Sequence, residues 1–294
     1  MTDLCRIKIA IASGKGGTGK TFISTNLFHT LVKLGYKVTL VDCDAEEPND
    51  MLFFKTDCVT ECDVKQKVPV IDLKKCIYCG KCKEYCNYNA IFFLREKKVI
   101  RVLDDLCHGC GACAYACDSG AITEKDVSLG KVSTCIINDD SKIVEARLRV
   151  GVYTPVPVIK AALKTICKDE IVIMDSPPGT SCPFIQTVSI ADYVLLVTEP
   201  TPFGLSDLKQ SVETLKTMNK LYGVIVNRAG IGDDGVYEYL KQENIPLLME
   251  VPFDKNIALS YSKGEFVVNN KNEWNSLLEL MFITICDKYG NVNN

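Results

Sequence analysis

The feature that most constrains this chain is a glycine-rich segment near its N-terminus. Residues 14–21 are Gly-Lys-Gly-Gly-Thr-Gly-Lys-Thr and fit the phosphate-loop pattern G-x-x-x-x-G-K-[ST]. The β-branched apolar residues 7–12 before it predict a strand, and residues 22–34 after it predict a helix. Glycines let successive backbone N–H groups curve around phosphate oxygens at the start of a helix. Motif and context together predict a nucleotide site and argue against a glycine turn without a ligand.

The phosphate-loop pattern also assigns chemistry to individual residues. Lys20 is expected to reach the β- and γ-phosphates of ATP as a catalytic residue, and Thr21 is expected to bind Mg²⁺. The rest of the expected phosphate cradle is formed by Gly14, Lys15, Gly16, Gly17, Thr18 and Gly19.

Strand and helix signals continue in the order of an α/β domain. Gly35 is a predicted helix C-cap, and residues 37–41 predict a second buried strand that closes on Asp42. Later strands are expected at residues 171–174, 193–197, 224–226 and 247–251, with a helix at 205–222. This order predicts a three-layer α/β P-loop NTPase domain with a parallel sheet.

A cysteine-rich segment interrupts this alternation of strands and helices. The chain has 16 cysteines, and eight of them fall in two copies of one short unit. Residues 76–91 and 107–122 both contain C-x2-C-x2-C-x3-C, a shared glycine and a final Ala-Ile pair, at an offset of 31 residues. This spacing is the bacterial ferredoxin pattern. We therefore expect an inserted α+β ferredoxin-like domain at residues 67–127, between the two parts of the ATPase domain at 1–66 and 128–294.

In the ferredoxin pattern the fourth cysteine lies too far along the chain to bind the same cluster as the first three, so it binds the other cluster. The spacing thus predicts two [4Fe–4S] clusters that exchange one ligand. The first is assigned to Cys76, Cys79, Cys82 and Cys117. The second is assigned to Cys107, Cys110, Cys113 and Cys86.

Other uses of these thiols fit the spacing less well. Zinc sites usually combine two separated C-x-x-C pairs. A disulfide framework is typical of secreted proteins, whereas this N-terminus has no signal-peptide pattern, and we expect a cytoplasmic protein. Asn87 and Asp118 stand where ferredoxins usually carry proline, which alters the turn or the local field but removes no ligand. His108 is interpreted as a packing residue, because the cysteine set is complete without it.

The sequence resembles the MinD/ParA superfamily of P-loop ATPases that contain an inserted ferredoxin domain. The nucleotide part is similar to the nitrogenase iron protein, since Lys15 follows the first glycine of the loop. The resemblance implies that Lys15 is catalytic and reaches the nucleotide across an ATP-dependent homodimer. For the segment Asp42-Cys-Asp44, it implies that Asp42 lies near Mg²⁺ and that Asp44 acts on the attacking water. The alternatives are a solvated loop lysine and carboxylates that cap the next turn.

The same resemblance extends to the second half of the chain. In Asp175-Ser-Pro-Pro-Gly179 it implies a Mg²⁺ role for Asp175 and a γ-phosphate sensor at Gly179. It also implies contacts with the nucleotide base for Asn227, Pro252 and Phe253.

Cysteines outside the repeated unit are harder to place. Cys182 follows the second switch, where the nitrogenase iron protein carries a cluster ligand, so it is a speculative third metal site; otherwise it is a small residue packed under the switch. No role is assigned to Cys135 and Cys167. The roles of Cys58 and Cys62 are left open, because these residues lie near the repeated unit.

Three functions agree with these motifs. The first is an ATPase in which nucleotide state controls electron transfer through the clusters, with an unidentified redox partner. The second is an ATP-dependent iron–sulfur or metallocofactor assembly factor, although Cys286 is alone where carrier ATPases have a C-terminal C-x-x-C. The third is a MinD-like positioning switch, but residues 274–286 resemble a core helix more than a basic membrane helix.

Composition excludes some broad classes. The net charge is −3, which gives no general attraction to nucleic acid or anionic membranes, so no nucleic-acid partner is expected. No apolar run approaches the roughly 18 residues that a membrane-spanning helix needs, so no stable membrane insertion is expected.

Overall fold

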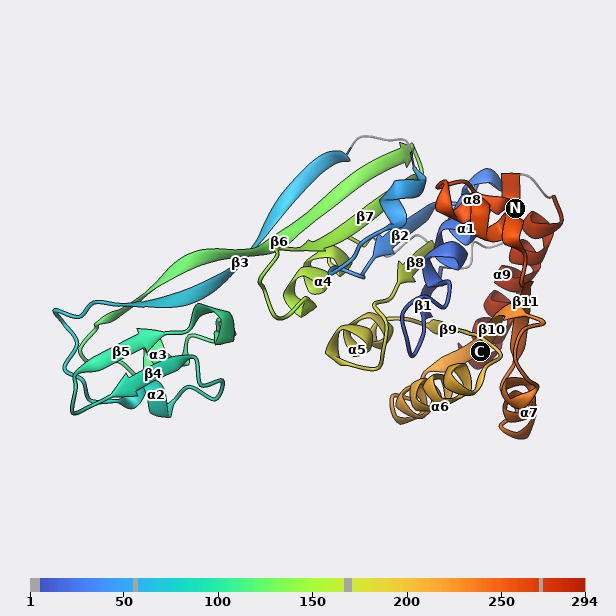
Figure 1. The fold of residues 1–294 in the computed structure, drawn as a ribbon. Helices are drawn as coiled ribbons and strands as arrows, with labels where there is room; N and C mark the ends of the chain where they lie inside the picture. Colours follow the sequence, from blue (N-terminus) through green and yellow to red (C-terminus); the bar gives the residue numbers. More distant parts are fainter. Residues whose placement is uncertain (1–5, 55–57, 167–170, 270–271, 294) are drawn as a thin grey trace.

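The computed structural model describes residues 6–54, 58–166, 171–269 and 272–293. In these residues one sheet has nine strands in the order β11-β10-β9-β1-β8-β2-β7-β6-β3 (Figure 1). The parallel strands are β1 (Lys8–Ala12), β2 (Val38–Asp42), β7 (Ser141–Leu148), β8 (Ile171–Asp175), β9 (Tyr193–Thr198), β10 (Leu221–Ala229) and β11 (Leu247–Pro252). Antiparallel pairing adds β6 (Ile122–Asn138) and β3 (Cys58–Ile71) at one edge.

Helices cover both faces of the parallel part. On one face lie α1 (Lys20–Lys33), α8 (Lys255–Ser262) and α9 (Asn272–Asn293), with the short turns η1 (Asp50–Phe53) and η3 (Val267–Asn269). On the other face lie α4 (Val156–Leu163), α5 (Cys182–Ser189), α6 (Pro202–Thr217) and α7 (Gly235–Gln242). The expected three-layer parallel-sheet fold is confirmed.

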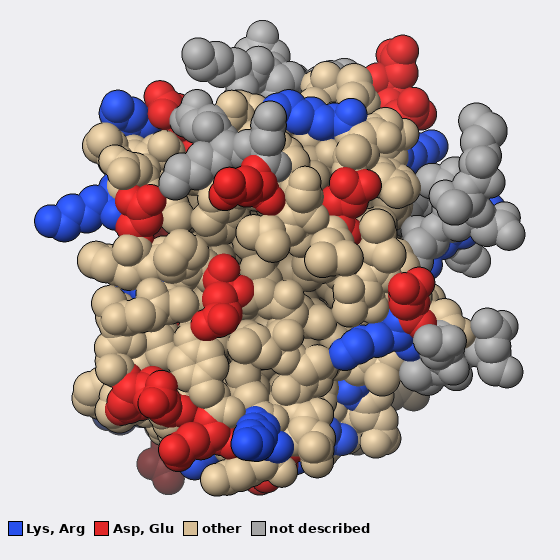
Figure 2. Space-filling view, turned by 90° about the vertical axis from the view of Figure 1, so that its right-hand side faces the viewer, with Lys and Arg blue, Asp and Glu red and all other residues tan. Residues whose placement is uncertain are grey.

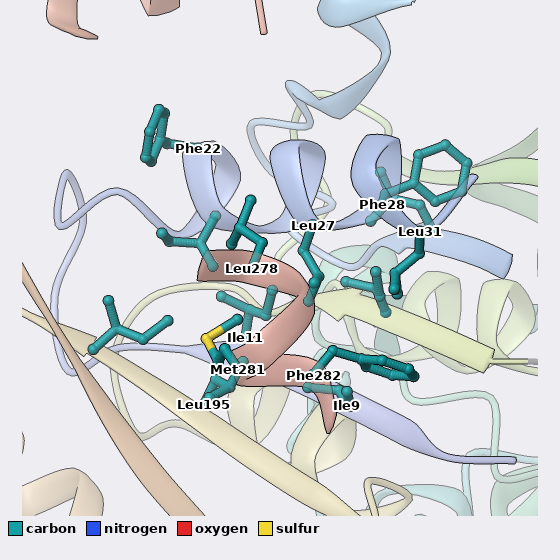
Figure 3. Close-up of a cluster of buried hydrophobic side chains, with 14 of the residues drawn as sticks. Ile9, Ile11, Phe22, Leu27, Phe28, Leu31, Leu195, Leu278, Met281 and Phe282 are labelled. Carbon is teal, nitrogen blue, oxygen red and sulfur yellow. The ribbon is translucent and has the colours of Figure 1, made fainter. Parts of the chain in front are cut away.

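The central strands are apolar throughout because they are buried on both faces. In β1, Ile9 and Ile11 point into the core beneath α1 and α9, whereas Ala10 and Ala12 face the opposite core. Figure 3 shows Leu278, Met281 and Phe282 of α9 packed between α1 and the sheet. The C-terminal helix therefore belongs to the core, as its sequence predicts.

One expected helix is too long. The helix predicted at residues 205–222 begins at Pro202 and ends at Thr217, and Leu221 already pairs with Tyr193 in the sheet. The reason is a left-handed turn at Asn219, whose φ is 52° and which reverses the chain between α6 and β10.

The remaining edge of the sheet is drawn out into an arm. Strands β3 and β6 pair from Cys58 and Cys135 to Ile71 and Ile122. Only the part of β6 from Gly130 onward also pairs with β7, so the rest of the β3–β6 ribbon projects away from the ATPase core (Figure 1).

A small unit, residues 72–121, lies at the far end of this ribbon (Figure 1). It contains α2 (Lys81–Glu84), β4 (Ile91–Leu94), β5 (Val99–Val102), η2 (Asp104–Leu106) and α3 (Ala112–Tyr115). Its small core is built from Cys82, Ile91 and Cys113. The expected domain limits at 67 and 127 fall within β3 and β6, because these strands run without a break from the sheet into the unit.

The face opposite the arm is mixed in charge. In Figure 2, which views the molecule from that end, basic and acidic side chains are interspersed among uncharged ones, and neither sign forms a continuous patch on the described part of this face. Among the described residues, none of the helices has the length and apolar character needed to cross a membrane.

Candidate functional site

The phosphate loop connects β1 to α1, as the sequence predicts. Gly17 and Gly19 have φ values of 75° and 101°, which side chains other than glycine rarely adopt, and α1 begins directly after them at Lys20. Gly14 lies against α6: a Cβ atom there would be 2.5 Å from the carbonyl oxygen of Asp207. The loop is therefore held by close backbone packing in the shape that a phosphate cradle requires.

Two of the expected Mg²⁺ residues are in direct contact. The Thr21 hydroxyl donates a hydrogen bond of 2.7 Å to Oδ2 of Asp175, at the end of β8. Burial raises the pKa of Asp175 to about 6, although the charge of Lys20 and the hydrogen bond from Thr21 oppose the shift. A hydroxyl and a buried carboxylate next to a phosphate loop form a donor set that fits Mg²⁺.

Asp42 lies beside Asp175 in the sheet register, at the end of β2. Its Oδ1 accepts a hydrogen bond from the Asp44 N–H at 3.0 Å, and its Oδ2 accepts bonds from the N–H groups of Asn49 and Asp50 at 2.8 and 3.0 Å. Burial, together with the negative charge of Asp175, raises the pKa of Asp42 well above its usual value. Asp42 thus anchors the loop of residues 43–50. For the segment Asp42-Cys-Asp44, the capping of the next turn by carboxylates was only the alternative interpretation of the sequence.

Asp44 is half-buried in this loop. Burial raises its pKa, and the positive charge of Lys20 opposes that shift. The carboxyl group of Asp44 therefore lies within the electrostatic reach of the phosphate-loop lysine.

Lys15 is held by an acid that the sequence analysis did not identify. Its Nζ lies 3.1 Å from Oε2 of Glu199, and Nη1 of Arg228 lies 2.6 Å from Oε1 of the same carboxylate. Glu199 directly follows β9 and is only 6% exposed. A charged residue just after the apolar run of residues 194–197 was the available signal for this position.

The expected base-contact residues lie at the ends of β10 and β11. The Asn227 side chain donates a hydrogen bond of 2.7 Å to the Thr18 carbonyl of the phosphate loop. Pro252 ends β11, and the N–H of Phe253 donates to Ala229 at 3.0 Å, while the Phe253 ring is 54% exposed. Asn227 is thus hydrogen-bonded to the phosphate loop in this conformation.

Two cavities in the small unit at the far end of the arm are lined by cysteines. One is lined by Cys76, Cys79, Cys82 and Cys117. The other is lined by Cys86, Cys107, Cys110 and Cys113. Each cavity thus combines three cysteines from one motif with the fourth cysteine of the other motif.

The four thiol groups of each cavity line an open volume and are not gathered around one common centre. All eight are free, and among the described residues no three Cys, His, Asp or Glu side chains converge on a single metal ion. Four thiol groups around one cavity are a donor set that fits a [4Fe–4S] cluster. Gly80 and Gly111, with φ values of 90° and 73°, start the helices that present the cysteines.

His108 lines the second cavity and stacks on Tyr88, with ring centroids 3.8 Å apart. This contact agrees with the packing role expected for His108.

The other cysteines are dispersed. Cys182 is free and exposed at the start of α5, and Cys62 is free and exposed on the arm. Cys135, which the sequence leaves unplaced, is disulfide-bonded and so is not a metal ligand in this structure. Cys167 lies outside the described residues.

The parallel sheet and the loop between β1 and α1 define a P-loop nucleotide-binding α/β protein. Residues 9–268 match the family described as the CobQ/CobB/MinD/ParA nucleotide binding domain, and the chain belongs to this family. It is a MinD/ParA-type P-loop ATPase.

Individual relatives agree with this membership. The chain is 35% identical over 265 residues to an uncharacterised protein of Methanocaldococcus jannaschii, with 87% of this chain and 90% of that protein covered. It is 24% identical to an iron–sulfur cluster carrier protein of Aquifex aeolicus, with 88% of this chain and 61% of the relative covered. The structure of the septum site-determining protein MinD with Mg-ADP from Pyrococcus horikoshii aligns with a TM-score of 0.56 at 21% identity, over 94% of each chain.

Proposed function

We propose that this ATPase couples its nucleotide state to one-electron transfer through two [4Fe–4S] clusters held in the cysteine cavities. The observation that carries the proposal is the division of the eight cysteines into two sets of four, each around its own cavity. This division matches the ligand exchange that is typical of two-cluster ferredoxins, and this match supports the proposal. Residues 67–127 then form a ferredoxin-like domain inserted in the ATPase.

In this proposal MgATP binds at the phosphate loop. Lys20 neutralises charge on the β- and γ-phosphates, Thr21 and Asp175 hold Mg²⁺, and Asp44 orients the water that converts ATP to ADP and phosphate. Lys15 reaches the nucleotide of a second copy in an ATP-dependent homodimer. Asn227, Pro252 and Phe253 surround the base. Cys182 is not needed for either cluster.

A chain of backbone hydrogen bonds supports coupling between the two parts. The Leu148 N–H, at the end of β7, donates to the carbonyl of Ala45 in the loop that Asp42 anchors, at 2.7 Å. Strand β7 pairs with β6, and β6 continues into the arm that carries the cavities. A change in the loop at residues 43–50 is therefore transmitted through paired strands to the base of the arm.

The test uses anaerobically purified full-length chain. We expect about eight iron atoms per chain and EPR signals of reduced [4Fe–4S] clusters after treatment with dithionite. Stopped-flow mixing of the reduced protein with a one-electron acceptor dye should give different oxidation rates with and without MgATP. Lys20→Ala, which should not bind the nucleotide productively, is the control. Coupling is refuted if the rates are equal and if ATP hydrolysis is also the same in the oxidised and reduced protein.

A second candidate function is iron–sulfur cluster assembly. The similarity to a protein named as an iron–sulfur cluster carrier favours it. Incubation of the cluster-loaded chain with an apo-ferredoxin and MgATP would decide between the two, because a carrier transfers its cluster and an electron-transfer protein keeps it.

A MinD-like positioning switch is a weaker alternative. Leu278, Met281 and Phe282 of α9 are buried in the core, whereas Leu277, Leu280 and Ile283 on the same helix are exposed. Residues 274–286 contain no lysine or arginine that would attract anionic lipids, unlike a basic membrane helix. Liposome co-sedimentation with ATP tests this alternative.

A further inference from the structure

Asp50 is a buried acid that none of the proposed steps uses. It is 0% exposed at the start of η1, at the end of the loop that Asp42 anchors. The Ser24 hydroxyl of α1 donates to Oδ1 of Asp50 at 3.3 Å. The N–H of Asp50 donates to Asp42, so the backbone of Asp50 and not its carboxyl group holds the loop in place.

The second carboxylate oxygen of Asp50 has no hydrogen-bond donor. Oδ2 of Asp50 and Oδ1 of Asp175 are both buried and both unpartnered. The two residues belong to one group: Asp42 accepts from the N–H of Asp50 and lies beside Asp175 in the sheet register, while Ser24 and Thr21 at the start of α1 donate to Asp50 and Asp175. A buried carboxylate oxygen without a partner carries a large desolvation cost, so each of the two indicates a missing donor or cation.

The charges of the neighbouring side chains also indicate a cation next to Asp50 and Asp175. Asp42, Asp50 and Asp175 are all buried, and Lys20 is the cation of the phosphate loop that acts on this group. Arg147 also acts on Asp42 but is paired with Glu145, so the three carboxylates outnumber the cations near them, and a divalent cation would neutralise the excess negative charge. Thr21, the hydroxyl expected to bind Mg²⁺, is bonded to the other oxygen of Asp175.

We propose that Asp50 is a third carboxylate of the Mg²⁺–nucleotide site, where its free Oδ2 accepts a hydrogen bond from a water molecule on the Mg²⁺ held by Thr21 and Asp175. Asp50 is thus a positioning residue for the metal. This inference rests on the Mg²⁺–ATP site proposed above and deepens it. Since Asp42 and Asp50 mark the two ends of the loop at residues 43–50, a Mg²⁺ held next to Asp50 would also hold this loop.

A matched pair of variants separates a metal role from a packing role. Asp50→Asn keeps the shape and the bond from Ser24 but removes the charge. Ser24→Ala removes the bonds from the Ser24 hydroxyl to Oδ1 of Asp50 and to the Thr21 carbonyl, but leaves Oδ2 of Asp50 in place. Loss of a residue that orients metal ligands typically weakens metal binding 10- to 100-fold. We expect Asp50→Asn to weaken Mg²⁺ binding by about this factor, and Ser24→Ala to change it by less than about threefold.

The full-length chain is titrated with Mg²⁺ in the presence of a fluorescent ATP analogue. The titration is repeated with Mn²⁺, whose free form is counted by EPR, so that the metal is observed directly. In EDTA the analogue should bind the wild type and Asp50→Asn equally. Without metal, Asp50→Asn should melt at a higher temperature than the wild type, because one of three crowded carboxylates is gone.

The outcomes are distinct. If Asp50→Asn binds Mg²⁺ and Mn²⁺ as tightly as the wild type, this inference is wrong and the Mg²⁺–ATP site stands. If the wild type binds the analogue equally in Mg²⁺ and in EDTA, the proposed site fails, and this inference fails with it. Asp50→Ser, which leaves room for water, provides the same measurement should the Asn variant not fold.

Discussion

The ammonium group of Lys15 lies 3.1 Å from the buried carboxylate of Glu199 in the same chain. Lys15 is the lysine that we propose to act on the nucleotide of a second copy, so in the single chain it is held away from that task. Glu199 is shared with Arg228, a residue in the left-handed conformation with φ of 56°. The three side chains form a contact that has to rearrange when two copies meet.

Glu199→Gln should release Lys15. We expect the variant to dimerise at a roughly three- to tenfold lower ATP concentration, as measured by light scattering, because the competing contact is weakened. Its free energy of unfolding should fall by about 1–3 kcal/mol, since hydrogen bonds to a charged group are lost. Lys15→Ala is the control that should not dimerise. A need for more ATP would mean instead that Glu199 holds Lys15 in its active position.

The exchange of cysteines between the two cavities predicts an unequal result for two double variants. Cys76→Ser with Cys117→Ser removes two ligands of one cavity, so about four iron atoms should remain. Cys113→Ser with Cys117→Ser removes one ligand from each cavity and should impair both clusters. Iron analysis and EPR of the reduced protein measure the difference, with Cys62→Ser on the arm as control. The reverse pattern would show that each motif binds its own cluster.

Gly14→Ala should destabilise the phosphate loop. The added Cβ would meet the Asp207 carbonyl oxygen at 2.5 Å, which forces α6 or the loop to move at a cost of roughly 1–3 kcal/mol. Gly16→Ala is the matched control, because a Cβ there has nothing within 4 Å. Urea unfolding of the two variants and the wild type checks the prediction, which fails if the two alanines cost the same.

His29 should make stability depend on pH. Its ring stacks on Phe266 with centroids 4.1 Å apart and bonds Asn269, and burial lowers its pKa below the usual 6.5. The unfolded chain therefore binds a proton at a higher pH than the folded chain does. The stabilising contribution is complete above about pH 6.5 and is lost as the pH falls through the lowered pKa.

The measurement is thermal unfolding of the wild type and His29→Gln between pH 5 and pH 8. Their difference should be constant above about pH 7 and should shift in favour of the variant at lower pH. A difference that does not change with pH would show that His29 is not buried in its neutral form.

The long arm shows a limit of pattern reading. Strand β3 contains Lys65, Gln66 and Lys67 in succession, and much of the ribbon is exposed on both sides. A strand is recognised in sequence when one face is buried and residues alternate, or when both faces are buried and the run is apolar. A ribbon that leaves its sheet meets neither condition, so its strands were not predicted.

What the sequence alone determined are the features whose chemistry is local. The phosphate loop needs neighbouring glycines and Lys20, and a cysteine motif needs fixed short spacings, so both were visible without a fold. The tertiary structure determined which distant residues contact these local features. Glu199 meets Lys15, and Asp175 meets Thr21, only because the strand order brings the ends of β8 and β9 close to the loop after β1. Contacts between residues more than 100 positions apart are set by the packing of the sheet, and no local pattern records them.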